Sequence, residues 1–150
     1  MSKRKPSVEQ PLSKLKLPAV KPGEWRGEVF GPCQLSFGQI LQPAPYGQSV
    51  EFTYLIVPAF YKRTGDSYEW HGAIMIGPPT PMKTEFPEAG FVYVNPYLGS
   101  LTLNLHVERQ QFSDMLPLFM CKKFKDLHFT IADPIGDDIR ISSWGMGLEL

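Results

Sequence analysis

LHVERQQFSDMLPLFMCKKFKDLHFTIADP, residues 105–134, contains the change of hydrophobic period that indicates the fold. Apolar and polar residues alternate along residues 99–108 and again along 127–132, as in strands that bury one face. Between these segments, apolar residues recur at the spacing of one helix face, at Phe112, Met115, Leu116 and Phe119. The stretch therefore predicts a strand, a short helix at about 109–121 and a second strand. Pro117 interrupts the helical pattern, so we expect a helix that is short, kinked or late to begin.

Outside this stretch, the chain after Trp25 consists of short strand candidates separated by turns. The longest candidate is SVEFTYLIVPAFYKR, residues 49–63, and the turn RTGDS predicts that it forms a hairpin reaching residue 77. Pro58 cannot donate a ladder hydrogen bond, so we expect this strand to lie at a sheet edge or to bulge there. Together the candidates predict a mainly β fold, an antiparallel β-sandwich or barrel of about six to eight strands with one short helix.

Composition and length limit the class of protein. The chain has 150 residues, which suits one domain, and 43% of them are hydrophobic, with 10 Phe, 6 Tyr and 3 Trp available for a core. No apolar stretch approaches the roughly 20 residues of a membrane helix, and no apolar segment of a secretory signal follows the N-terminus. We therefore expect a cytoplasmic protein with no membrane partner.

The charges divide the chain into an extended basic arm, residues 1–23, and an acidic β-rich domain, residues 24–150. Four prolines oppose helix formation in the arm, while Leu15, Leu17 and Val20 are spaced to lie against a groove or a sheet edge. We expect the arm either to be solvated or to dock on a partner or a neighbouring subunit. The candidate partner-binding residues of the arm are Lys3, Arg4, Lys5, Lys14, Lys16 and Lys21.

Histidines are the first candidates for chemistry. His71, His106 and His128 each fall on a predicted strand, and a shared sheet face would bring them near one another. Their spacing matches no metal-ligand motif, and two cysteines far apart in the sequence add none. We therefore interpret the histidines as surface residues, keep them only as weak metal candidates, and expect no cofactor.

Cys33 and Cys121 are the two cysteines, and we expect reduced, partly buried thiols. Cys121 has lysines next to it, which would favour a reactive thiol, but it ends an apolar helical stripe, and this position favours burial. The chain also lacks a serine-nucleophile motif and a phosphate-binding loop. These features favour a protein that is not an enzyme.

Three functions are compatible with these observations. The one most favoured is a non-catalytic interaction or assembly module, whose basic arm docks on a partner or another subunit, as in viral or phage-like structural assemblies. The second is a single-stranded nucleic-acid-binding protein with an OB-like body, for which strand aromatics would stack on bases and Lys122, Lys123 and Lys125 would contact phosphates. The third is a small-ligand-binding or enzymatic β-sandwich with an aromatic pocket that includes one histidine.

Overall fold

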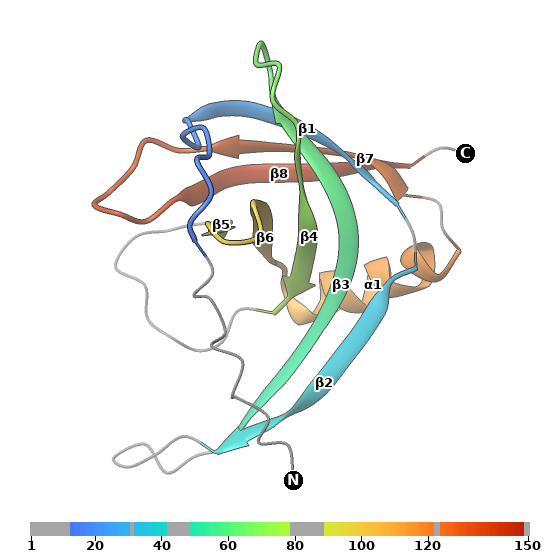
Figure 1. The fold of residues 1–150 in the computed structure, drawn as a ribbon. Helices are drawn as coiled ribbons and strands as arrows, with labels where there is room; N and C mark the ends of the chain where they lie inside the picture. Colours follow the sequence, from blue (N-terminus) through green and yellow to red (C-terminus); the bar gives the residue numbers. More distant parts are fainter. Residues whose placement is uncertain (1–12, 31, 42–48, 79–88, 122–123, 149–150) are drawn as a thin grey trace, which may run out of the picture.

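The computed structural model describes residues 13–30, 32–41, 49–78, 89–121 and 124–148, which form eight strands and one helix (Figure 1). The helix α1 spans Arg109–Met120 and contains Pro117 within it rather than in its first turn. The predicted mainly β fold with one short helix is confirmed. The strands are β1 (Gly23–Val29), β2 (Gln34–Leu41), β3 (Ser49–Arg63), β4 (Trp70–Gly77), β5 (Gly90–Asn95), β6 (Ser100–His106), β7 (Phe124–Ile131) and β8 (Arg140–Leu148).

Seven of these strands close into a barrel, and β2 extends from it as an extra strand (Figure 1). The order is β1-β7-β8-β5-β6-β4-β3, and β3 pairs back to β1. All neighbours are antiparallel except β4 and β6, which are parallel. An odd number of strands cannot alternate in direction around a closed ring, so one parallel pair is required. The predicted antiparallel arrangement therefore holds at every other pair, and β4 with β6 is the one exception among the described strands.

Side chains fill the interior of the barrel. Along β6, Leu101, Leu103 and Leu105 are buried and their neighbours are not, as the period-two alternation predicted. Large rings occupy much of the remaining interior. The rings of Trp25 and Phe129 stack with centroids 5.8 Å apart, and Tyr61 meets Phe129 edge-on at 6.0 Å. The barrel is therefore a packed core, as is usual for barrels of this strand number.

Different segments cover the two ends of the barrel. Three antiparallel pairings separate β6 from β7, so these strands run in opposite directions and α1 joins them across one end (Figure 1). Phe112 and Phe119 of α1 are buried against the core. At the opposite end lie residues 13–22, of which Leu17 and Val20 pack against the core. The described part of the chain contains no helix that is long and apolar enough to cross a membrane.

Pro58 lies in the middle of β3, which pairs with β4 on one side and with both β2 and β1 on the other. The predicted hairpin with β4 is confirmed, but the expectation of an edge strand or a bulge at Pro58 is wrong. The β2 pairing ends at Ile56 and the β1 pairing begins at Ala59, so Pro58 falls where the partner changes. Its carbonyl accepts a hydrogen bond from the Phe30 N–H at 3.0 Å. The nitrogen and the carbonyl of a strand residue face the same neighbouring strand. The N–H that Pro58 lacks would therefore point to the place where the partner of β3 changes from β2 to β1.

Gly72 in β4 should be intolerant of any side chain, because an added Cβ would overlap the carbonyl oxygen of Leu101 in the parallel neighbour β6. We expect Gly72→Ala to lower the free energy of unfolding by about 1–3 kcal/mol, the usual cost of overpacking. Urea unfolding measures this change. Gly147→Ala is the matched strand control, since its Cβ would meet Asp126 only at an ordinary 3.5 Å. Equal stability of the two variants would contradict the close approach of β4 to β6.

Candidate functional site

The three histidines lie on the outside of the barrel and do not converge. His71 lies in β4, His106 in β6 and His128 in β7, and the first and last of these are exposed. His106 is half-buried, with its ring edge-on to Phe91 at a centroid distance of 5.9 Å. Within the described ranges, no group of three or more His, Cys, Asp or Glu residues could hold a metal ion. Nor does any of the three lie in the barrel interior, where the third predicted function would place one.

The two thiols differ in environment. Cys33 is half-buried, whereas Cys121 is exposed directly after the end of α1. The expectation that Cys121 is buried is therefore wrong. The buried stripe of α1 ends at Phe119, and a residue two positions further along a helix points to nearly the opposite side. Cys121 is thus turned toward solvent.

The described part of the arm docks on its own barrel. The Leu15 N–H donates to the Pro96 carbonyl at 2.8 Å, and the indole N–H of Trp25 donates to the Lys21 carbonyl at 3.0 Å. Arg63 donates from Nε to the Pro22 carbonyl at 2.9 Å. The Lys14, Lys16 and Lys21 side chains remain exposed, and Lys3, Arg4 and Lys5 lie outside the described residues. Binding of a partner by these lysines stays a prediction.

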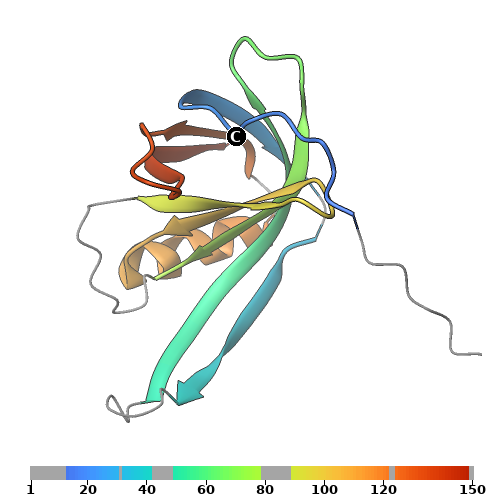
Figure 2. The ribbon, with the colours of Figure 1, turned by 60° about the vertical axis from the view of Figure 1, so that its left-hand side comes forward.

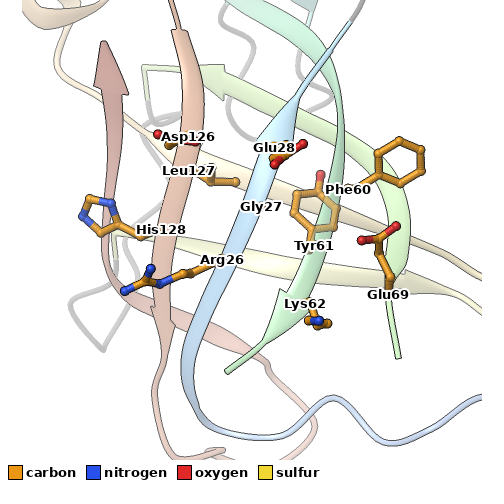
Figure 3. A pocket seen from close by; sticks show the side chains of 10 residues that line it. All are labelled: Arg26, Gly27, Glu28, Phe60, Tyr61, Lys62, Glu69, Asp126, Leu127 and His128. Atoms are coloured by element: carbon orange, nitrogen blue, oxygen red, sulfur yellow. The ribbon is translucent and has the colours of Figure 1, made fainter. Parts of the chain in front are cut away.

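A hollow of about 700 Å³ lies on the outer face of β7, β1 and β3 (Figure 3). The strand register arranges most of its exposed side chains in two rows. One row is basic and consists of His128, Arg26 and Lys62. The next row consists of Asp126, Glu28 and Phe60, and it is acidic over β7 and β1. The residues that line the hollow are Arg26, Gly27, Glu28, Phe60, Tyr61, Lys62, Glu69, Asp126, Leu127 and His128.

These rows define what the hollow can bind. Each row places like charges on neighbouring strands, which is unfavourable for the fold itself and is relieved by a ligand of opposite charge. The rows are only two residues apart along each strand, roughly 7 Å. A phosphate backbone bound to Arg26 and Lys62 would therefore also meet Glu28 and Asp126, which repel it. The hollow suits a surface that carries charges of both signs.

The structure separates the aromatic residues that the nucleic-acid alternative would use as one stacking surface. Tyr61 and Trp70 are buried in the core, whereas Tyr68 and Tyr93 are exposed on the β3–β4 connection and on β5. Of the lysines assigned to phosphate contact, Lys125 is exposed in β7, while Lys122 and Lys123 lie outside the described residues. Nucleic-acid binding stays a prediction. No single described surface brings these aromatic residues and lysines together.

β2 and the first half of β3 project beyond the barrel as a two-stranded ribbon (Figures 1 and 2). We call residues 34–41 and 49–56 the β2–β3 ribbon. β2 pairs with β3 over its full length, whereas β4 joins the other side of β3 only from Leu55. Most of the ribbon therefore has no third strand among the described residues. A two-stranded ribbon is only marginally stable alone in water, so its position outside the barrel requires an explanation.

The ribbon carries apolar side chains on both faces, exposed on one face and half-buried on the other. Leu35 and Phe37 share a face with the buried Leu55, so they continue the line of the barrel interior, yet they are 47% and 75% exposed. On the opposite face, the rings of Phe52 and Tyr54 stack on each other with centroids 5.6 Å apart. The apolar stripe that forms the core of the barrel thus continues past α1, where none of the described residues covers it.

β2 also has an open edge with none of the usual protection. Among the described residues it pairs with β3 alone, and the sequence from Gln34 to Val50 contains no Asp, Glu, Lys or Arg. Native edge strands usually carry lysine, proline or a bulge that prevents pairing with another chain. The strand periods in the sequence did not predict this surface. The signal was the run of 17 residues without a charge in a chain that is 20% charged overall.

Comparisons with known proteins add no assignment. No family model matches the sequence, and neither a curated protein nor a solved structure shows significant similarity to the chain.

The docked arm should contribute to stability through its apolar side chains. Replacing half-buried Leu17 by Ser removes apolar contact with the core, and we expect the free energy of unfolding to fall by about 1 kcal/mol. The exposed neighbour Lys16 is the matched control, and Lys16→Ser should change stability by less than about 0.5 kcal/mol. Denaturant unfolding measures both. An unchanged midpoint for Leu17→Ser would show that residues 13–22 do not pack on the barrel in solution.

Tyr61 carries a buried hydroxyl without a hydrogen-bond partner in the described part of the chain. Burial raises the pKa of Tyr61, because the interior disfavours the charged form. Above about pH 10 the unfolded chain loses this proton while the folded chain keeps it, so stability falls as the pH rises. Tyr61→Phe should remove that part of the pH dependence. It should also raise the free energy of unfolding by about 1 kcal/mol, because an unsatisfied buried group is removed.

Thermal unfolding of wild type and Tyr61→Phe at neutral and alkaline pH checks both effects. Tyr93→Phe is the control, because Tyr93 is 58% exposed and water solvates its hydroxyl. A marked loss of stability in Tyr61→Phe would instead show that the hydroxyl has a partner.

Proposed function

We propose that this protein is a non-catalytic interaction module that binds another protein chain through the β2–β3 ribbon. The observation that carries the proposal is Phe37, 75% exposed on an uncharged strand with an open edge. An exposed apolar strand of this kind is a template for strand addition, in which backbone hydrogen bonds provide affinity and alternate side chains provide specificity. The packed barrel serves as a rigid base that holds the ribbon away from its own core.

A protein partner fits the ribbon better than a lipid bilayer does. The hydrocarbon of a bilayer would accept the apolar surface of the ribbon, which is formed by Leu35, Phe37 and the Phe52–Tyr54 pair. However, the free edge of β2 carries backbone N–H and C=O groups, and each such group left unpaired in hydrocarbon costs several kcal/mol. An extended protein segment satisfies those groups and covers the side chains at the same time.

A protein partner also fits better than nucleic acid. The Phe52 and Tyr54 rings could stack on bases, but the described side chains of the ribbon include no cation that would hold a phosphate backbone. The exposed arm residues Lys14, Lys16 and Lys21 support a second, polar contact with an acidic region of the same protein partner. A role as a subunit of a larger assembly, of the viral or phage-like kind, is part of this proposal.

Substitution of Phe37 tests the proposal. A tagged full chain is isolated from cells that also express an untagged copy, with and without nuclease treatment, and the species that remain bound, including the untagged copy, are identified by mass spectrometry. We expect a protein retained in stoichiometric amount that resists nuclease and is lost from Phe37→Lys, because lysine both removes apolar contact and charges the edge. Met120→Lys is the matched control, since Met120 is 77% exposed but lies at the end of α1.

Two results would count against this function. One is retention of nucleic acid alone. The other is retention of the same proteins by Phe37→Lys and by the wild-type chain.

A further inference from the structure

We infer that the partner of the β2–β3 ribbon is a second copy of this chain, paired β2 to β2 about a twofold axis. The result is one continuous sheet in the order β3-β2-β2-β3 that joins two barrels. This inference rests on the proposed function and names its partner. Three properties of the ribbon carry it, which are the open edge, the charge pattern and the face occupied by Phe37.

The open edge is complementary to itself. β2 pairs with β3 through all eight of its residues, so it is extended along its full length, and no described residue pairs with its other side. Two antiparallel strands related by a twofold axis normal to the sheet match each donor of one to an acceptor of the other. Such a contact uses the same patch on both copies and closes into a dimer.

The absence of charge favours a copy over a different protein. In a twofold contact each residue lies against or near its own counterpart, so any charged residue on the edge would repel itself. The run from Gln34 to Val50 contains no such residue. Its described polar side chains are Gln34, Ser36 and Gln39, whose amide and hydroxyl groups both donate and accept hydrogen bonds and so can pair with their own kind. A partner of different sequence is usually selected by complementary charge, which this edge does not offer.

Pairing about this axis also covers the exposed apolar stripe. A twofold axis normal to the sheet keeps equivalent residues on one face, so Leu35 and Phe37 of both copies lie together. Opposed residues in an antiparallel pair share a face, so the registers that pair most of β2 are centred on Phe37 or on Gly38. In either register the two Phe37 side chains are directly opposite or diagonal neighbours. The dimer therefore supplies the wall that the interior line of the barrel lacks past α1.

Charged substitutions of Phe37 test this pairing in the full-length chain. Sedimentation velocity is measured over a range of concentrations, in reducing buffer because Cys121 is exposed. We expect wild type and Met120→Lys to form dimers, and Phe37→Lys and Phe37→Glu each to be monomeric. An equimolar mixture of the two Phe37 variants should restore a dimer that contains one of each, because opposite charges then meet across the axis.

Hydrogen exchange of the wild-type chain gives a second measurement that needs no variant. Amides of β2 on the edge away from β3 should be protected at high concentration and should lose that protection on dilution, whereas amides of β6 should not change. This readout remains decisive if a Phe37 variant does not fold.

The outcomes separate this inference from the proposed function. A wild-type chain that is monomeric at every concentration, or a dimer that neither Phe37 variant dissociates, overturns the pairing. If the wild-type chain is monomeric but a different protein is still lost from Phe37→Lys, the proposed function stands and only the identity of the partner is wrong. If Phe37→Lys also retains every bound protein, both fail.

Discussion

Pairing between β1 and β3 closes the barrel, and the remaining structure depends on that closure. β3 is 15 residues long and pairs with β2, β1 and β4, so it links the barrel wall to the ribbon. Closure with seven strands requires a parallel pair, which is β4 with β6, and Gly72 closely approaches Leu101 within that pair. It also sets the point where β3 exchanges β2 for β1, and Pro58 occupies that point because a missing donor disrupts neither ladder there.

Because side chains fill the interior of the barrel, its binding surfaces are sought on the outside. Trp25, Tyr61 and Phe129 pack into the space in which a larger barrel would hold a ligand, while α1 and residues 13–22 cover the two ends. Binding surfaces must then be outer faces, edges or projections. The charged hollow over β7, β1 and β3 is one such surface, and the β2–β3 ribbon is another. They differ in chemistry, since the hollow carries charges of both signs and β2, the edge strand of the ribbon, carries none.

The ribbon continues the sheet of the barrel and leaves one edge of β2 open among the described residues. Leu35 and Phe37 extend the interior line of β3 outward, beyond the reach of α1. Apolar surface that continues a core is costly to leave in water, and the unpaired edge of β2 is a template for a further strand. One added strand with apolar alternate residues would satisfy both. The proposed interaction follows from this shared requirement, and the lack of charge makes a second copy the simplest source of that strand.

The sequence by itself determined several local elements and, for β6, α1 and β7, most of the buried face. The change of period between Leu105 and Ile131 predicted β6, α1 and β7, and the hairpin of β3 with β4 followed from its turn. These features rest on neighbours in the chain, whose spacing is visible in the sequence. Tertiary structure alone decided closure, the parallel pair, the projection of β2 and the exposure of Cys121. Those depend on which distant strands pair, and an alternating pattern states only that one face is buried, not against which partner.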